Sequence, residues 1–358
     1  MKIAILTLPL KTNYGGILQA YALQTILKRM GHDVKVLDKP RVYKKPAYWK
    51  YPFRALHKLL INKHTVIKKE KFAKVREQGI QQFIKRHIHT HLTNSLADIS
   101  EKDFDCFVVG SDQVWRSRYF CRMWQTTFAD AFLSFTRRWN IKRIAYAPSF
   151  GVDHWAYEGE CDSIIQAIQQ FDAVSVREAS GITLCREHLD TNAHHVLDPT
   201  MLLTKEDYTH LFTTDNTPES PGDLFCYVLD DNVSKNKLIQ HIAQEKNLTP
   251  YHINKQHIKP SITMWLRGFH DAKFVVTDSF HACVFSILFG KPFIAVGNVK
   301  RGMERFRSLL GMFGLEENLI TDISSYKSDY NYTPCKSVDE RLSQWREISH
   351  HFLAKELA

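Results

Sequence analysis

Short apolar segments alternate with amphipathic ones along most of this chain. Residues 2–8 are apolar and rich in β-branched side chains, which is typical of a buried strand, whereas residues 17–30 repeat their apolar positions at helical spacing. A loop containing two glycines separates them, and residues 34–37 form the next apolar segment. The first 38 residues therefore predict a strand–helix–strand unit, which favours a parallel sheet with right-handed crossovers.

The same alternation continues through two halves of the chain. In the first half, further strands are predicted at 106–109, 143–147 and 173–176. A segment with Pro and Gly at 213–222 has the composition of a linker, and the alternation starts again beyond it. The second half is predicted to contain strands at 224–229, 250–253, 274–277 and 293–296, helices at 235–245, 262–268 and 282–289, and a terminal amphipathic helix at 338–357.

These patterns predict an α/β protein with two doubly wound, Rossmann-like domains that face a cleft. The expected division is an N-terminal α/β domain at 1–200, a linker region at 201–222, a C-terminal α/β domain at 223–335 and a C-terminal helix at 336–358. Ligands of such folds bind at the carboxyl ends of the strands. We therefore expect the functional site in the cleft, on loops that follow strands.

The composition is that of an ordinary globular protein. Of 358 residues, 44% are hydrophobic and 24% are charged, which excludes disorder, collagen and coiled coil. The longest apolar runs, at 104–110 and 282–289, are far shorter than the roughly 20 residues that a membrane-spanning helix needs. The first residues lack the pattern of a secretory signal, and seven cysteines without a Cys-x-x-Cys pair indicate neither a disulfide framework nor a zinc ribbon. A cytoplasmic protein is expected.

Positive charge is concentrated in one segment. Residues 41–91 contain fourteen Lys and Arg against two acidic residues, while the whole chain has a formal net charge of +10. We expect a basic helical insertion at about 41–92. It either binds an anionic partner, such as a membrane surface or a phosphorylated substrate, or is a solvated helical face. No nucleic-acid-binding motif accompanies it, so nucleic acid is not an expected partner.

The segment 274–292 carries the most specific chemical signal. An apolar strand leads into Asp278 and Ser279, which are good N-cap residues, and then into a short helix that ends at Gly290. The N-terminus of this helix would face the cleft and attract an anion, most naturally a phosphate. His281, in the first turn, would be placed for proton transfer beside that anion. Alternatively, Asp278 and Ser279 only cap the helix, and His281 is a half-buried ring.

Cationic side chains follow two other predicted strands. Arg177 ends the strand at 173–176, where it could bind an anion in the cleft or pair with a neighbouring carboxylate. The segment after 293–296 carries a second group, which can clamp phosphate or carboxylate or be a surface charge run. The candidate residues of that group are Asn298, Lys300, Arg301 and Arg305.

Small polar residues follow the strands at 2–8 and 106–109. Ser111 and Asp112 belong to a Gly-Ser-Asp-Gln-Val-Trp sequence whose side chains suit the hydroxyls and the ring face of a sugar, although a turn with a core Trp would also explain it. The first loop, Asn-Tyr-Gly-Gly, departs from the dinucleotide-binding Gly-x-Gly-x-x-Gly pattern. The His residues lack convincing metal-binding spacing, so no metal site is expected.

Taken in order, these segments resemble the polysaccharide pyruvyl transferase family. The likeness covers roughly residues 1–320. It rests on Asn-Tyr-Gly-Gly-Ile-Leu-Gln at 13–19, Val-Val-Gly-Ser-Asp-Gln-Val-Trp at 108–115, Arg-Glu at 177–178, Asp-Pro at 198–199, Thr-Asp-Ser-Phe-His at 277–281 and the Lys-Pro-Phe-Ile segment that begins at 291. The resemblance implies a fold similar to the two-domain GT-B glycosyltransferases. It also implies transfer of pyruvate from phosphoenolpyruvate to two hydroxyls of a sugar as a cyclic ketal, in the assembly of a cell-surface or capsular polysaccharide.

The resemblance implies roles on the donor side. His281 matches the family's histidine beside phosphoenolpyruvate and is expected to act as the acid/base, with Asp278 orienting it. Arg177 matches an anion-binding arginine of the family, and Arg301 is expected to act with it. Many members carry Arg where this chain has Ser279, so the missing positive charge must come from elsewhere. The candidates are Arg177, Lys300, Arg301 and Arg305.

On the acceptor side, Asn13 and Asp112 are expected to contact the sugar, together with Gly15, Gly16 and Ser111 beside them. Phosphoenolpyruvate is a substrate in this scheme, so no cofactor is expected. The acceptor would be a glycan or a lipid-linked sugar. In the second case, the basic segment would hold the enzyme at the anionic inner face of the membrane.

Two other functions remain open. A nucleotide-sugar-dependent GT-B glycosyltransferase could use the same architecture, although the sequence shows no clear acidic ribose partner near residue 300. A catalytically inactive glycan-binding relative would keep the cleft and lose the chemistry, and the serine at position 279 is the feature that favours it.

Overall fold

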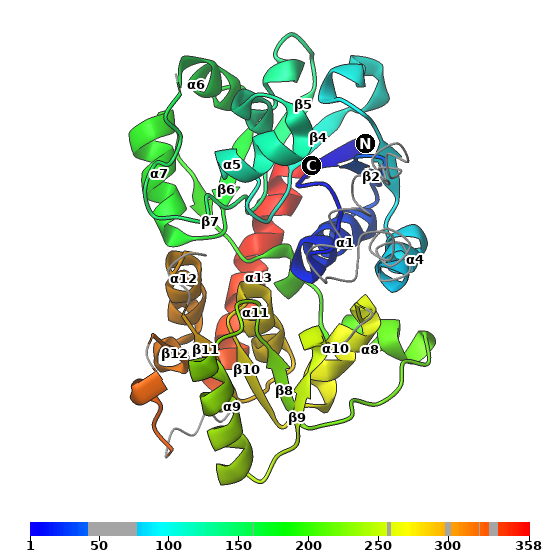
Figure 1. Ribbon diagram of the computed structural model, residues 1–358. Coiled ribbons are helices and arrows are strands. Elements are labelled where there is room, and N and C mark those ends of the chain that lie inside the picture. Colours follow the sequence, from blue (N-terminus) through cyan, green and yellow to red (C-terminus); the bar gives the residue numbers. More distant parts are fainter. Residues whose placement is uncertain (42–76, 160, 256–258, 298–301, 322, 329–335) are drawn as a thin grey trace, which may run out of the picture.

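Two α/β domains make up the described part of the chain in the computed structural model, which comprises residues 1–41, 77–159, 161–255, 259–297, 302–321, 323–328 and 336–358. Each domain is built on a parallel sheet, and the first lies above the second in Figure 1. A long helix follows the second sheet. The prediction of an α/β protein with two doubly wound domains and a C-terminal helix is confirmed by this topology.

The first sheet has the strand order β3-β2-β1-β4-β5-β6-β7 in the described residues. Its inner strands are buried along almost their whole length, as expected where helices cover both faces of a parallel sheet. The order reverses between β1 and β4, so their carboxyl ends form the switch point at which such folds bind ligands. The strands are β1 (Lys2–Leu6), β2 (Asp33–Asp38), β3 (Thr90–Leu92), β4 (Cys106–Val109), β5 (Lys142–Ala145), β6 (Ala173–Val176) and β7 (His194–His195).

The second sheet has the order β12-β11-β10-β8-β9 in the described residues, and its switch point lies between β8 and β10. Its strands are β8 (Leu224–Tyr227), β9 (Pro250–His252), β10 (Phe274–Thr277), β11 (Phe293–Val296) and β12 (Leu319–Ile320). The α-helices in the described residues are α1 (Tyr14–Arg29), α4 (Gln78–His87), α5 (Ser117–Phe120), α6 (Asp162–Ile168), α7 (Ala179–Leu189), α8 (Lys205–Thr214), α9 (Val233–Glu245), α10 (Ile262–Asp271), α11 (Phe280–Leu288), α12 (Glu304–Phe313) and α13 (Lys336–Leu357).

Helix α13 joins the two domains. Figure 1 shows it, in red, running from the second domain back to the first. Its Arg346 donates hydrogen bonds to two carbonyl oxygens of the connection between the domains, and Ser349 Oγ accepts one from the Leu197 amide. The Phe352 ring lies 6.2 Å from the Tyr146 ring of the first domain. The last helix is therefore a part of the core.

Two boundaries differ from those predicted. The glycines expected in the first loop belong to the first turn of α1, because Asn13 is the extended N-cap residue and the helix begins at Tyr14. The expected linker region 201–222 contains α8, which packs on α10. The strands β3, β7 and β12 were not predicted, since two or three residues carry too little pattern.

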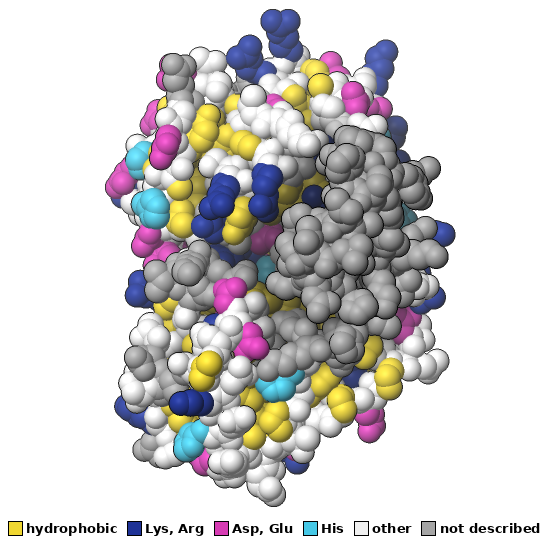
Figure 2. Space-filling model, in the orientation of Figure 1, with side chains coloured by type: hydrophobic (Ala, Val, Ile, Leu, Met, Phe, Trp, Pro, Cys, Tyr) yellow, Lys and Arg dark blue, Asp and Glu magenta, His cyan; other side chains and the backbone are white. Residues whose placement is uncertain are grey.

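Most of the basic insertion, residues 42–76, lies outside the described residues. Its remainder forms α4 and then the edge strand β3, so the helix expected to reach residue 92 is wrong over Thr90–Leu92. On the face shown in Figure 2, the described Lys and Arg side chains are interspersed with acidic ones. The predicted contact with an anionic membrane stays a prediction. Among the described residues, no helix combines the length and apolar character needed to cross a bilayer.

Replacing Leu353 tests whether α13 belongs to the core. Leu353 is completely buried, so Leu353→Ala is expected to lower the free energy of unfolding by about 2–5 kcal/mol in urea denaturation. Lys355→Ala, at a largely exposed position of the same helix, should change it by less than about 0.5 kcal/mol. Equally small effects of both substitutions would contradict the role of α13.

Candidate functional site

The loops after β1 and β4 meet at the switch point of the first sheet. The side-chain amide of Asn13 donates a hydrogen bond to Asp112 Oδ2 over 3.1 Å. Asp112 has a φ of 62°, a left-handed conformation that costs a non-glycine residue about 1–3 kcal/mol and that clusters at functional sites. Ser111 is buried beside it and donates to Asp198 Oδ2 over 3.3 Å. The polar residues predicted in these two loops are thus brought together.

A buried ion cluster surrounds Arg177 at the end of β6. Its Nη1 donates to Asp198 Oδ2 over 2.6 Å, and its other guanidinium nitrogens lie 3.8 Å from Asp112 and 3.9 Å from Glu178. Thr200 donates to the second oxygen of Asp198 through both its amide and its hydroxyl. These contacts place one guanidinium among three carboxylates, away from solvent.

The charges of this cluster stabilise one another. Burial acts to lower the pKa of Arg177, but the neighbouring carboxylates, Asp198 first, outweigh it and raise that pKa. Burial likewise acts to raise the pKa of Asp198, but the His281 ring and the Arg177 guanidinium bring it well below its usual range. Asp198 and Arg177 are therefore both charged at neutral pH.

His281 reaches this cluster from the second domain. It lies in the first turn of α11, and its Nε2 is 3.6 Å from Asp198 Oδ2. The ring lies directly over Gly15 of α1, because a Cβ added to Gly15 would be 2.0 Å from His281 Nδ1. Only glycine leaves room for the imidazole there, which explains the glycine at position 15.

A second arginine approaches from α12. The guanidinium carbons of Arg305 and Arg177 lie 5.5 Å and 4.4 Å from the centre of the same ring, that of Phe280. Burial, together with the charge of Arg177, lowers the pKa of Arg305 to about 10. The loop before α12 touches the first domain at Gly302, whose φ is 87° and where a Cβ would lie 2.2 Å from the Gly151 carbonyl oxygen. Two like charges are thereby held close together at the domain interface.

Several buried polar atoms of this cluster lack a hydrogen-bond partner within the described residues. They are Nε and Nη2 of Arg177, Oε2 of Glu178 and Nε2 of His281. The other carboxylate oxygen of Glu178 accepts from Ser149 Oγ and from the Gly151 amide. These atoms face charged partners at 3.6–3.9 Å, beyond hydrogen-bond range, so they can still form hydrogen bonds with a polar ligand or with water.

Three helices begin around this point. Asn13, Glu178 and Ser279 are the N-cap residues of α1, α7 and α11, and none of their side chains makes a capping hydrogen bond. The first amides of a helix carry partial positive charge and attract anions. The arrangement can therefore bind an anion and hold an imidazole next to it.

Asp278 lies outside this cluster. Its carboxylate accepts hydrogen bonds from the amides of Leu229 and Asp230 and from Lys235 Nζ, over 2.6, 3.0 and 2.7 Å. The prediction that Asp278 orients His281 is wrong, because these bonds turn the carboxylate towards the loop after β8. The carboxylate beside the imidazole is that of Asp198.

The remaining predicted residues divide into two groups. Ser279 is buried at the start of α11, where its amide donates to Thr277 Oγ1, and Gly16 lies against the side chains of Asn13 and Asp112. A second set lies outside the described residues and stays predicted, namely Asn298, Lys300 and Arg301. No three His, Cys, Asp or Glu side chains in the described ranges are arranged to hold a metal ion.

Two residues of the cluster were missed as site residues. Asp198 and Glu178 both occur in the motifs that carry the family resemblance, but neither was given a role in the site. The Asp-Pro and Arg-Glu pairs after strands were the available signals.

The sequence of this chain matches a family model. The model described as "Polysaccharide pyruvyl transferase" matches residues 13–300, a range that contains every residue of the cluster except Arg305. The chain belongs to the polysaccharide pyruvyl transferase family. As a member, it is assigned to the transferases that act with a small-molecule donor and a sugar acceptor. Among curated proteins, none matches the chain.

Solved structures of similar architecture are distant from this family member. The UDP-GlcNAc 2-epimerase from Neisseria meningitidis bound to UDP-GlcNAc is 9% identical, with a TM-score of 0.49 and coverage of 100% of this chain and 99% of that chain. The UDP-GlcNAc 2-epimerase from Methanocaldococcus jannaschii is 12% identical, with a TM-score of 0.44 and coverage of 98% and 93%. At these values the likeness carries no argument about a reaction or a ligand.

Gly15→Ala is expected to move the His281 ring, because the new Cβ would lie 2.0 Å from Nδ1. The imidazole signals of His281 in NMR spectra should shift. Gly311→Ala in α12 is the matched control, since its Cβ would meet only Glu316 Oε1, at 3.6 Å. That control should leave the His281 signals unchanged and stabilise the protein by up to about 1 kcal/mol. Unchanged His281 signals in Gly15→Ala would refute the contact.

Asp278→Ala is expected to destabilise the second domain, because it leaves Lys235 buried without its carboxylate. The free energy of unfolding in urea should fall by about 3–5 kcal/mol. Glu206→Ala, which removes the partner of Lys205 in an exposed pair, should cost less than about 1 kcal/mol. A loss below about 1 kcal/mol for Asp278→Ala would show that this carboxylate is not structural.

Proposed function

We propose that this protein transfers pyruvate from phosphoenolpyruvate to two hydroxyls of a sugar, forming a cyclic ketal on a precursor of a cell-surface or capsular polysaccharide. The observation that supports this most strongly is the set of unsatisfied buried atoms of Arg177, Glu178 and His281 next to a second arginine. Membership in the pyruvyl transferase family supports it independently.

Phosphoenolpyruvate fits the chemistry of the cluster. It carries a phosphate and a carboxylate, which suit helix amides and guanidinium groups. Three carboxylates surround the Arg177 charge. Arg305 is therefore the better candidate to supply the positive charge that many family members carry at the position of Ser279. Two arginines against three carboxylates do not neutralise a multiply charged donor. The proposal therefore assigns further positive charge to Lys300 and Arg301.

The proposed reaction requires one proton for the donor and removes one from each hydroxyl. His281 gives a proton to the methylene carbon, and the first hydroxyl attacks the adjacent carbon and returns its proton to His281. The bond to phosphate then breaks, the second hydroxyl attacks, and its proton leaves with the phosphate. The products are the ketal and hydrogen phosphate. Asp198, 3.6 Å from Nε2, holds the ring and stabilises it while it carries the proton.

The acceptor in this proposal is a glycan or a lipid-linked sugar, held in part by Asn13 and Asp112. Phosphoenolpyruvate is consumed as a substrate, and no cofactor is proposed. If the acceptor is lipid-linked, the basic segment would bind the enzyme to an anionic membrane face. Each well-placed Lys or Arg would contribute about 1 kcal/mol to that binding free energy.

His281→Ala is expected to reduce turnover by about 10²–10⁴-fold, because it removes the proposed acid/base. The assay measures inorganic phosphate released from phosphoenolpyruvate in the presence of a panel of sugars, with mass spectrometry of the sugar product. His241→Ala, at a largely exposed position on α9, is the control and should keep full activity.

Near-normal turnover by His281→Ala would refute the role of His281 as the acid/base. Turnover of UDP-sugars by the wild-type protein, with no release of phosphate from phosphoenolpyruvate, would instead identify the nucleotide-sugar glycosyltransferase. Binding of glycans without either reaction would identify the inactive relative.

A further inference from the structure

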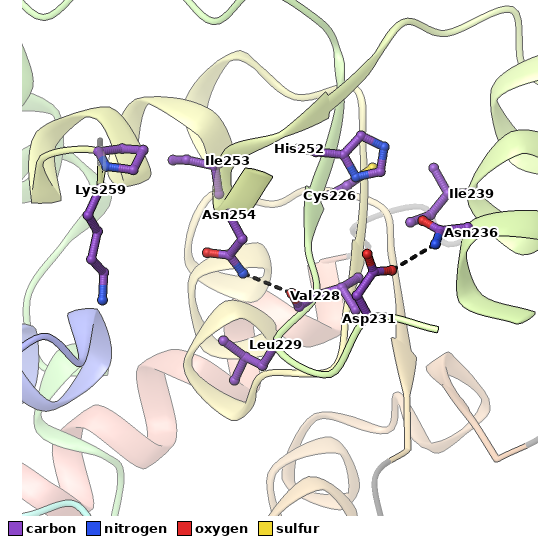
Figure 3. Close-up of a pocket in the computed structure, with 11 residues that line it drawn as sticks. Cys226, Val228, Leu229, Asp231, Asn236, Ile239, His252, Ile253, Asn254 and Lys259 are labelled. Atoms are coloured by element: carbon purple, nitrogen blue, oxygen red, sulfur yellow. Dashed lines mark hydrogen bonds between the residues drawn. The ribbon is translucent and has the colours of Figure 1, made fainter. Parts of the chain in front are cut away.

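A pocket of about 360 Å³ lies at the carboxyl ends of β8 and β9 (Figure 3). This position, outside the strand ends of a doubly wound sheet, is where such folds bind ligands. The volume is near the lower end of the range for small-molecule sites, roughly 300–1,000 Å³, and suits a ligand of one or two rings. The pocket lies beside the ion cluster of Arg177, Asp198 and His281 but shares none of its residues.

The lining combines apolar surface with fixed hydrogen-bonding groups. Ile239, Ile253 and Leu229 contribute the apolar part, and the Leu229 side chain is 37% exposed. Asp231 Oδ1 accepts a hydrogen bond from Asn236 over 2.8 Å, and the Asn254 amide donates to the Val228 carbonyl oxygen over 2.8 Å. Figure 3 shows both bonds at the pocket wall. Carboxylate and amide groups beside apolar surface match the hydroxyls and C–H face of a sugar.

The charge of the pocket does not favour an anion. In the described lining, Asp231 is the acidic residue and Lys259 the basic one. Lys259 is directed towards the first domain, where it donates to the Thr12 carbonyl oxygen and lies 4.8 Å from the centre of the Tyr14 ring. A diphosphate would need more cations than this.

Two connections place the pocket next to His281. Asp278, three residues before the histidine, accepts from the amides of Leu229 and Asp230 in the loop that forms one wall. On the other side, Tyr14 precedes the glycine under the imidazole, and its hydroxyl donates over 2.6 Å to the carbonyl oxygen of Pro260, which lines the pocket. Both walls of the pocket are therefore attached to the segments that flank His281.

We infer that this pocket binds an uncharged sugar unit of the acceptor, adjacent to the unit that receives pyruvate. The inference rests on the proposed function for the identity of the acceptor. It assigns to Asp231 and Asn254 the selection of the glycan, separately from the groups that bind the donor.

The test compares Asp231→Ala and Asn254→Ala with the wild-type protein. Binding is measured by saturation-transfer-difference NMR with neutral disaccharides (lactose, cellobiose and diacetylchitobiose) and with UMP, and phosphoenolpyruvate binding is measured by calorimetry. Asn192→Ala, at an exposed position between α7 and β7, is the control. We expect the two pocket variants to weaken disaccharide binding about tenfold each. Phosphoenolpyruvate binding should stay unchanged, and Asn192→Ala should match the wild type.

The outcomes separate this inference from the proposed function. Disaccharide binding that depends on the pocket in a protein that does not bind phosphoenolpyruvate would support the pocket and refute the donor. Disaccharide binding that is unchanged in both variants, or absent from the wild-type protein across the panel, would overturn the inference. UMP binding that is lost in the variants would overturn it in favour of a nucleotide pocket.

Discussion

The buried carboxylate of Asp198 is the contact on which the site depends. It accepts hydrogen bonds from Arg177, Ser111 and Thr200 of the first half of the chain, and it faces His281 of the second domain. A charge removed from water is tolerated only when its partners are in place. The cluster is therefore complete only while both domains are packed against each other, which α13 and the contact at Gly302 maintain.

The fold explains why these groups meet. Each sheet has a switch point where the strand order reverses. There the loops that follow two adjacent strands run to opposite sides and border a crevice at the carboxyl ends of the strands. In the first sheet this brings Asn13 to Asp112, and in the second it brings Asp278 to the loop after β8. Because the two sheet edges face each other, the N-termini of α1 and α11 meet. The absence of a Cβ at Gly15 lets the His281 ring pack against α1.

The local parts of this arrangement could be predicted from the sequence, and its pairings could not. The buried parallel strands β4 and β11 are continuous apolar runs, and β6 and β10 each contain a single polar residue, so their predicted limits match the structure. The placement of His281 in the first turn of a helix after a strand was also predictable from N-cap residues. Its partner was not, because Asp278 is nearer in sequence whereas Asp198 becomes a neighbour only through the packing of the domains. Arg177 was predicted to contact an anion or a neighbouring carboxylate, and Glu178 is adjacent to it in sequence, but Asp112 and Asp198 come from segments that only the fold unites with it.

The most direct test is a crystal structure of the protein with phosphoenolpyruvate bound. We expect the donor at the start of α11, in contact with Arg305 and with Nε and Nη2 of Arg177, and with its methylene carbon facing the His281 ring. Density for the donor elsewhere, with the imidazole still enclosed by Gly15 and Asp198 and no ligand beside it, would show that this cluster is not the donor site.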